Sequence, residues 1–457
     1  MYGGLLKSAS ALAIVAAAGL YGVSPASAAD LGGDCCADLE ERVAELEATT
    51  VRKGTRKVSV TLSGQISQEL LFWDDGISSD VYVGGANTSN SRWRFVGSAK
   101  ISPEITAGFL YELQAYASAT SSANQSPGGD DLGGALFGGG ANALREAMAW
   151  IEHSRLGRIS IGHGSNFANN SILVDLSGKG MAASNGVFLH GGNGFFIADS
   201  GGSYVNATWG QFMQGATGED WLNTRNEHIQ YRTPTIAGFT LGASFGEDNY
   251  WDVGIRYAGE FNGVRIAANV AYSVNSEFGT VEPTLPGDPP PAFPSALTCY
   301  GNCDKEVTQL AGSASIRHMP TGLFFTGAAG WRETDNAQSV SSTTGAITDR
   351  GSFDSSFYYL SAGIARNYFG LGDTVLYGEF SEWKGVGQSS FGTAAEDTTL
   401  QHWGVGIVQH VDAAAMELFV AYKNFSLKDT PTSGAGAISG LDAEDIHVVT
   451  AGTRIRF

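Results

Sequence analysis

Residues 450–457 read TAGTRIRF and are the last of the chain. Apolar and polar residues alternate here, with Val449, Ala451, Ile455 and Phe457 on one side and Thr450, Gly452, Arg454 and Arg456 on the other. Side chains of a β-strand point alternately to the two faces of its sheet. The segment therefore predicts a strand with one face suited to lipid and one suited to water.

The same period of two recurs along the chain from Val58 onward. Clear examples lie at residues 92–101, 323–331 and 417–423. Strands of a soluble β-sandwich run about five or six residues. The segments here run to about ten, the length that a tilted strand needs to cross a bilayer. The pattern favours an all-β transmembrane barrel over a soluble sandwich.

The connections between these segments alternate in length. Short turns are expected at residues 102–104, 154–156, 233–237, 260–262, 320–321, 370–372 and 412–413. Long loops rich in Gly, Ser and Asp are expected at 74–90, 118–142, 164–224, 272–305, 333–352, 384–397 and 429–443, with a shorter one near 247–250. Short turns on one side and long loops on the other are typical of outer-membrane barrels. Seven turns and eight loops predict a 16-stranded antiparallel barrel over residues 58–457.

The first 28 residues have the features of an export signal. Lys7 precedes an apolar run from Ala11 to Leu20, and small residues follow up to Ala28 and Ala29. Because that run is too short to span a membrane, we expect residues 1–28 to be a cleaved signal peptide. No later stretch reaches the ~20 apolar residues of a membrane helix.

Charge and cysteine content narrow the function. The formal net charge is −19, and removing residues 1–28 removes Lys7 and no acid, so that −19 minus one gives −20. Such a polyanion is a poor partner for nucleic acid. Cys299 and Cys303 suit a local disulfide in an exported protein, whereas adjacent Cys35 and Cys36 leave interchain pairing or free thiols. No His lies near either pair, so we expect no metal site and no cofactor.

Residues 29–57 form a separate periplasmic segment in this scheme. Leu39, Val43 and Leu46 follow helical spacing among charged residues, and Asp38 with Glu41 resembles a capping pair. A helix this short is marginal alone. It is stabilised as a small coiled coil in a trimer, or the segment is a solvated linker.

Several segments resemble known proteins. Thr450, Gly452, Ile455 and Phe457 resemble the signal by which the barrel assembly machinery recognises outer-membrane barrels. Residues 225–239 resemble the segment that follows the constriction loop of general porins, and residues 156–162 resemble the strand that leads into that loop. With residues 58–73 and 92–113, these make the chain resemble the porin family of rhizobia and related alphaproteobacteria.

That resemblance implies a homotrimer of 16-stranded barrels in the cell outer membrane of a Gram-negative bacterium, surrounded by lipid and lipopolysaccharide. Each barrel has a water-filled pore for passive diffusion of ions and small hydrophilic solutes. Some barrels of this kind are also tethered to peptidoglycan through a mature N-terminus that begins Ala-Asp. Ala29 and Asp30 match that pattern if cleavage follows Ala28.

The resemblance also implies that residues 164–224 fold into the barrel as a constriction loop. The acids of this loop are Asp175, Asp199, Glu219 and Asp220, and the arginines of nearby wall strands are Arg92, Arg94, Arg145 and Arg158. An acidic loop facing a basic wall places a transverse field across the pore. Of these residues, Arg92 and Arg94 are the ones we most expect to face the lumen. An Arg that faced lipid at the midplane of the bilayer would cost about 2–4 kcal/mol. The competing interpretation of each acid is a solvated loop charge.

The sequence contains no recognisable catalytic motif. The His residues lack H-E-x-x-H spacing, and residues 162–166, GHGSN, lack the final Gly of a nucleophile elbow. Gly138 to Gly140 are not followed by the Lys of a phosphate loop. We therefore expect no enzyme. Two alternatives to a general diffusion porin remain, namely a structural or receptor barrel and a substrate-selective channel.

Overall fold

The computed structural model describes residues 57–86, 88–115, 119–120, 123–126, 144–184, 193–213, 225–247, 249–276, 306–340, 347–391, 395–434 and 436–457. The expected signal peptide, the short helix within residues 29–57 and the pair Cys299 and Cys303 lie outside these residues. Within them, no helix has both the length and the hydropathy to span a bilayer.

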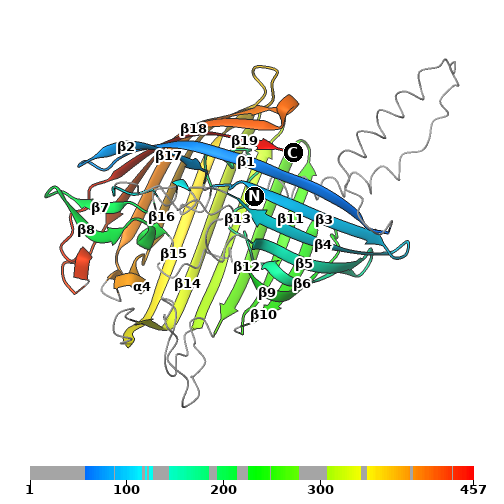
Figure 1. The fold of residues 1–457 in the computed structure, drawn as a ribbon, viewed down its shortest axis with the longest axis horizontal. Coiled ribbons are helices and arrows are strands. Elements are labelled where there is room, and N and C mark those ends of the chain that lie inside the picture. The colour runs from blue at the N-terminus through cyan, green and yellow to red at the C-terminus, as the bar shows by residue number, and fades with distance from the viewer. Residues whose placement is uncertain are drawn as a thin grey trace, which may run out of the picture.

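The wall strands form one closed antiparallel barrel (Figure 1). β1 (Ser59–Asp74) pairs with β3 (Arg92–Lys100) along its first half and with β2 (Ser79–Gly85) along its second half. β2 and β3 are therefore two parts of one wall strand, and β19 (Ile446–Arg456) closes the barrel against β1. The prediction of sixteen strands is confirmed. The other wall strands are β4 (Ile105–Gln114), β5 (Leu144–His153), β6 (Gly157–Ser165), β9 (Arg225–Arg232), β10 (Phe239–Gly246), β11 (Trp251–Phe261), β12 (Val264–Asn275), β13 (Glu306–His318), β14 (Leu323–Val340), β15 (Ile347–Arg366), β16 (Thr374–Lys384), β17 (Thr399–Val411) and β18 (Met416–Lys428).

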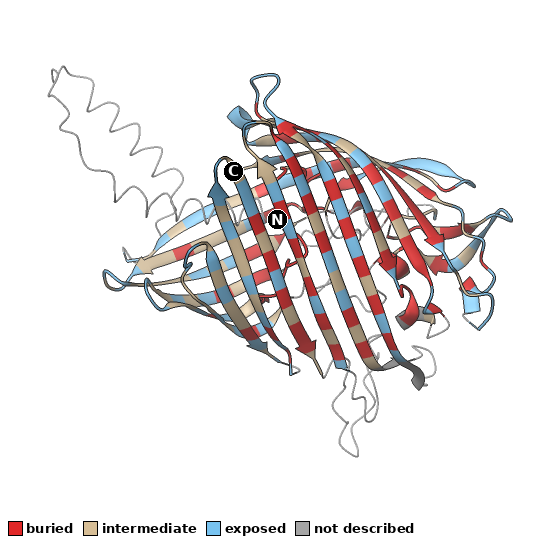
Figure 2. Cartoon of the chain, turned by 180° about the vertical axis from the view of Figure 1, so that it is seen from behind, coloured by how far each residue is buried: buried red, intermediate tan, exposed pale blue. Residues whose placement is uncertain are grey.

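Burial alternates along the strands, as the bands in Figure 2 show. On β17, the outward side chains Trp403, Val405 and Ile407 are exposed, whereas His402 before them and Val408 after them are fully buried. Exposed apolar side chains on a barrel wall contact lipid. The alternation in sequence therefore separates a lipid-facing surface from a lumen lined by polar groups and by the loop packed inside it.

The short turns lie at one end of the barrel. Asn262 and Gly263 join β11 to β12, and both have positive φ, 50° and 77°. That conformation is the type I′ turn that closes two-residue hairpins. Of the other short elements, η4 (Asp412–Ala414) lies in a turn at this end, whereas β7 (Phe196–Asp199), β8 (Ser203–Thr208), α3 (Gly210–Met213), α4 (Gln388–Phe391) and η5 (Gly436–Ile438) belong to the long loops.

Two expected loops differ from the structure. The loop expected at 333–352 is mostly strand, because β14 continues to Val340 and β15 already begins at Ile347. The loop expected at 74–90 is also largely strand. β1 and β2 pair up to Asp74 and Ser79, so this connection begins as a tight hairpin. Residues 88–91, which precede β3, turn inward, and Ser89 Oγ accepts a hydrogen bond from Gln65 Nε2. The Asp75 carboxylate accepts hydrogen bonds from the backbone N–H groups of Ile77 and Ser78, at 3.0 and 2.8 Å. These bonds fix the tip, and the polar composition that suggested a loop belongs to the tip and to residues 88–91.

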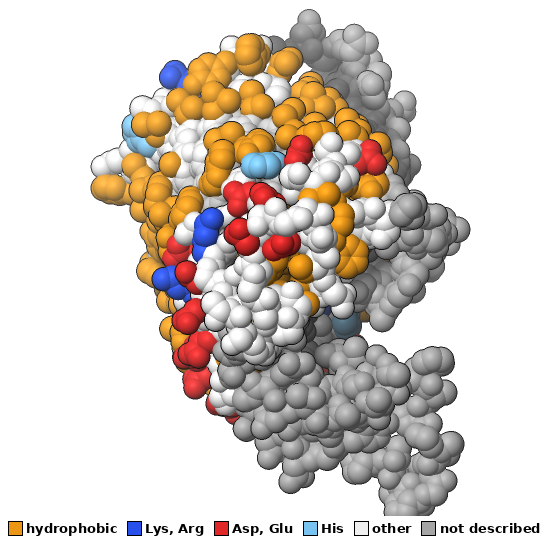
Figure 3. All heavy atoms as spheres, turned by 90° about the vertical axis from the view of Figure 1, so that its left-hand side faces the viewer, with side chains coloured by type: hydrophobic (Ala, Val, Ile, Leu, Met, Phe, Trp, Pro, Cys, Tyr) orange, Lys and Arg blue, Asp and Glu red, His pale blue; other side chains and the backbone are white. Residues whose placement is uncertain are grey.

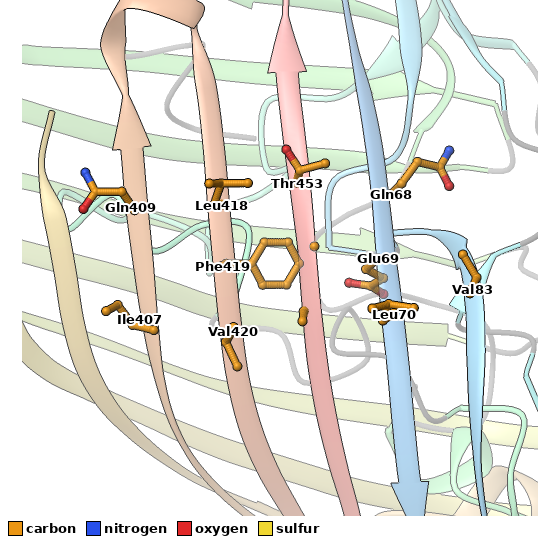
Figure 4. Close-up of a pocket in the computed structure, with 12 residues that line it drawn as sticks. Gln68, Glu69, Leu70, Val83, Ile407, Gln409, Leu418, Phe419, Val420 and Thr453 are labelled. Atoms are coloured by element: carbon orange, nitrogen blue, oxygen red, sulfur yellow. The ribbon is translucent and has the colours of Figure 1, made fainter. Parts of the chain in front are cut away.

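The terminal strand closes the barrel through its last residue. Phe457 and Gly64 of β1 exchange both backbone hydrogen bonds, at 2.9 and 3.1 Å. On the outer face, Ala451 is small, and neighbouring side chains border a groove of about 580 Å³ over β19. Figure 4 shows Leu418 and Val420 on one side of this groove and Leu70 on the other. Ile455 and Phe457 are exposed on the same face.

Candidate pore-lining site

Residues 166–184 of the long connection between β6 and β9 pack against the inner side of the barrel wall, as expected for a constriction loop. Its residues Phe167, Ile172 and Met181 have no exposed surface. Its described part contacts lumen-facing residues from β10 round to β17 and β1. We call its described residues, 166–184 and 193–213, the inner loop.

The inner loop is held at its start by Phe167. The backbone N–H of Phe167 donates to Ser244 Oγ at 2.7 Å, and the guanidinium of Arg256 stacks 4.2 Å from the ring centroid. The ring lies over Gly242 and Gly254, which are paired on β10 and β11. Two adjacent glycines remove side chains from this part of the wall, and the ring fills the resulting space.

A pair of serines on β13 holds the next part of the inner loop. Ser313 Oγ donates to the carbonyl of Ser171 at 2.6 Å and accepts from the N–H of Val174 at 2.9 Å. Ser315 Oγ accepts from the N–H of Leu176 at 3.0 Å. These bonds satisfy backbone groups that the buried loop would otherwise leave unpaired. The loop consequently follows the wall in a fixed register.

Asp175 is paired within the inner loop. Its carboxylate lies 3.4 Å from Lys179 Nζ, and it accepts hydrogen bonds from Ser177 Oγ at 2.8 Å and Thr326 Oγ1 of β14 at 3.3 Å. Lys179 is fully buried, with Nζ 5.6 Å from the Tyr359 ring centroid. Burial by itself raises the pKa of Asp175, but the charge of Lys179 and the bonds from Ser177 outweigh it and lower that pKa. Asp175 is therefore a structural acid facing β14.

Asp199 lies at the loop end of the barrel, on β7. Its carboxylate accepts hydrogen bonds from the backbone N–H groups of Gly201 and Asp442, at 3.0 and 3.2 Å. Figure 3 shows acidic side chains gathered on this end. The expected apposition of loop acids to wall arginines is therefore not met by Asp175 or Asp199, because both are engaged elsewhere. Glu219 and Asp220 lie outside the described residues.

Three of the predicted arginines converge on one carboxylate. Glu112 of β4 accepts hydrogen bonds from Arg94 Nε at 2.7 Å and Arg145 Nε at 2.8 Å. Arg92 Nη1 lies 3.4 Å from the same group, which is almost completely buried. Sequence reasoning missed Glu112, although its place between Tyr111 and Leu113 carries the same alternation that identified Arg92.

A β-bulge brings Arg145 to this cluster. The register between β4 and β5 shifts at Glu112, where Glu112 pairs with Glu146 and Leu113 with Leu144. Arg145 is the extra residue, and a bulge of this kind redirects a side chain. Arg145 Nη1 thus reaches Gln114 at 2.8 Å, while Glu146 also points inward and accepts from the N–H of Ser165 at 3.0 Å.

The fourth predicted arginine, Arg158, belongs to a separate group nearer the turns. Its Nε donates to Glu152 at 2.7 Å, and its guanidinium stacks 4.1 Å from the Trp150 ring centroid. In the β6–β9 register Arg158 is paired with Arg232. The arginines of the wall therefore form two groups, one around Glu112 and one nearer the turns. The described residues contain no cluster of His, Cys, Asp and Glu that could hold a metal ion.

The chain is similar to several known proteins of solved structure. The anion-selective porin from Comamonas acidovorans is 17% identical, with a TM-score of 0.53, over 88% of this chain and 100% of that chain. The outer membrane channel DcaP of Acinetobacter baumannii is 10% identical over 89% and 99%, with a TM-score of 0.48. Salmonella typhi OmpF in complex with daunomycin is 15% identical over 87% and 98%, also at 0.48. The first of these likenesses shows the fold.

The family of the chain follows from its sequence as a whole. A model of the Gram-negative porin family matches residues 9–430. No curated protein sequence matches the chain. The match spans most of the barrel, and the closed 16-stranded wall with a loop packed inside it agrees with that assignment. The chain belongs to the Gram-negative porin family and forms a diffusion channel in the outer membrane.

Proposed function

We propose that this channel is a water-filled pore for ions and small hydrophilic solutes, and that it favours anions along its basic wall. One observation carries the preference. Along the wall strands from β3 to β11, seven arginines stand against four carboxylates when Glu227, which pairs with His163, and Glu260, which pairs with Arg265 of β12, are left out. An excess of fixed positive charge attracts anions and repels cations. The arginines are Arg92, Arg94, Arg145, Arg158, Arg225, Arg232 and Arg256, and the carboxylates are Glu112, Glu146, Glu152 and Asp252.

A reversal potential tests this preference. The purified protein is inserted into a planar bilayer that separates two KCl concentrations. We expect zero current at a voltage displaced toward the chloride equilibrium potential. A displacement toward the potassium equilibrium potential would show that the acidic loop end of the barrel, rather than the basic wall, governs selectivity.

We further infer that three copies associate through the wall of β4 to β6, β9 and β10. These strands have 8 to 10 residues, whereas β13 to β18 have 11 to 20. At 3.3 Å per residue and a tilt of 45°, eight residues rise roughly 19 Å, less than the ~25 Å apolar band. The short wall exposes Ile159, Ile161 and Ile229. Contact with other copies removes the mismatch, and native mass spectrometry of the detergent complex should find trimers.

The terminal strand supports an assembly role. Thr450, Gly452, Ile455 and Phe457 form the segment that the barrel assembly machinery would read, and Ile455 and Phe457 are exposed on the lipid face. Phe457→Ser should lower the amount of folded barrel in the membrane, measured as heat-resistant mobility on gels. Unchanged assembly of this variant would contradict the proposal.

The wider resemblance supports the alphaproteobacterial branch of the family and the tether through Ala29, whereas the sequence itself supports the signal peptide and the disulfide. The mass of the mature protein tests removal of residues 1–28. Peptide mapping without reductant tests the bond between Cys299 and Cys303. Material released by muramidase should contain Ala29 joined to a peptidoglycan stem. If only free N-termini were found, the proposed tether would be wrong.

A further inference from the structure

A second group of arginines lines the lumen near the short turns. Arg158 is the second residue of β6, Arg232 is the last residue of β9, and Arg256 lies on β11. Their neighbours Ile159 and Tyr231 are exposed on the outer face. Because successive residues of a strand alternate between faces, these arginines point inward. We call Arg158, Arg232 and Arg256 the lower arginine group.

The lower arginine group carries an excess of positive charge. Arg158 and Arg232 are directly opposite each other on neighbouring strands, an arrangement of like charges that destabilises a sheet. The charged groups that interact electrostatically with Arg232 are Arg158, Arg256 and Glu152. Three guanidinium groups against one carboxylate leave two positive charges without compensation. In a packed protein such an excess is retained where water or an anion reaches it.

Protein partners occupy two of the three guanidinium groups. Arg158 binds Glu152 and stacks on Trp150. Arg256 Nη2 donates to the carbonyl of Phe167 at 2.5 Å. Throughout the described part of the chain, no hydrogen bond or ion pair reaches the guanidinium of Arg232. This side chain is half-buried, so its donors remain available to a solute in the lumen.

We propose that Arg232, with Arg158 beside it, binds the oxyanion group of a solute in transit, a carboxylate or a phosphate. A guanidinium presents parallel N–H donors that match either group with two hydrogen bonds. On its other side Arg232 is paired with Gly242, over which the ring of Phe167 lies. The site is thus bounded by a guanidinium and an apolar ring, which suits a small organic anion.

The site is distinct from the cluster around Glu112, where three arginines already share a buried carboxylate. The proposal rests on the channel function, because the solute reaches Arg232 through the pore. An anion held there reduces the current carried by chloride, and the reduction saturates when the site is full.

Single-channel recording in KCl with added potassium phosphate tests the proposal. In the wild-type channel the chloride current should fall and level off as phosphate is raised. Arg232→Gln should need about tenfold more phosphate for the same fall, since a charged hydrogen-bonding pair is lost. Arg265→Gln is the matched control, because it also removes one guanidinium near the turns. Arg265 is half-exposed and already forms an ion pair with Glu260 at 2.6 Å. This control should keep the wild-type response.

Each outcome is decisive. Equal phosphate responses of the wild type and Arg232→Gln would overturn the site. An equal weakening in Arg265→Gln would overturn it as well, because the general field would then explain the effect. In both cases a normal chloride current leaves the channel function intact. Absence of chloride current would contradict the channel and with it the site. Succinate in place of phosphate separates the two oxyanions, and an effect of neither would overturn the proposal.

Discussion

The ring of Phe167 fills the space that a side chain on Gly242 would occupy. A Cβ atom at position 242 would lie 2.1 Å from Phe167 Cδ2, closer than real atoms approach. Gly254, opposite Gly242 on β11, leaves the adjoining space free. This contact, together with the bond to Ser244, fixes the point at which the inner loop meets the wall.

Gly242→Ala should therefore loosen the inner loop. The added methyl group forces the ring of Phe167 to move, and overpacking of this kind costs about 1–3 kcal/mol. We expect a lower thermal midpoint and noisier single-channel currents. Gly378→Ala on β16 is the control, because a Cβ there has no neighbour closer than 3.9 Å. Equal behaviour of the two variants would refute the anchoring role of Phe167.

Removing the charge of Glu112 should increase anion preference. Glu112→Gln leaves Arg92, Arg94 and Arg145 without their shared carboxylate, so the reversal potential in a KCl gradient should move further toward chloride. Loss of one partner from a buried ion pair costs about 3–5 kcal/mol, so the variant should also unfold at lower temperature. Glu260→Gln, whose carboxylate is half-exposed, should leave both quantities near wild type. A folded Glu112→Gln channel with unchanged selectivity contradicts this account.

Acid should release the inner loop through Asp175. Its pKa lies below the ordinary 3.8 because Lys179 and Ser177 stabilise the carboxylate despite burial. A lowered folded pKa means that the stabilisation is fully present above 3.8 and is lost as pH falls through the folded value. Currents should stay steady from pH 7 to about pH 4 and become noisy below it. Asp175→Asn should be noisy already at neutral pH, and an unaltered acid response in this variant would argue against the mechanism.

The trimer interface can be tested on the outer wall. Ile161 on short β6 and Ile407 on long β17 are both exposed. Ile161→Asn should weaken trimers in native mass spectrometry, because an amide would be buried between copies. Ile407→Asn should leave the oligomer unchanged. The reverse result would place the interface on the long wall.

The strand pattern was predictable because each strand depends on local alternation. The inward direction of Arg92 and Arg94 follows from that alternation, and Glu112 and Arg232 carry the same signal. The position of Arg145 could not be predicted in this way, because alternation alone allows only one of Arg145 and Glu146 to face the lumen. Both can face it because of the bulge, which becomes visible only when β5 is aligned with β4.

The direction of Asp175 could not be read from the sequence. Its partner Thr326 lies 151 residues away, and Lys179 is an equally plausible solvated charge until the loop is packed. The contact of Phe167 with Gly242 has the same origin, since it requires the loop and two wall strands in one register. Local composition suggested an acidic constriction, and long-range packing turned one of its acids toward β14.

Single-channel recording of the purified, folded protein in symmetrical KCl tests the central claim most directly. A passive water-filled pore should give discrete conductance steps, a linear current against voltage near zero and a conductance that rises with the conductivity of the salt solution. A correctly folded barrel that passes no current at any salt concentration would contradict the claim that this chain forms a diffusion channel.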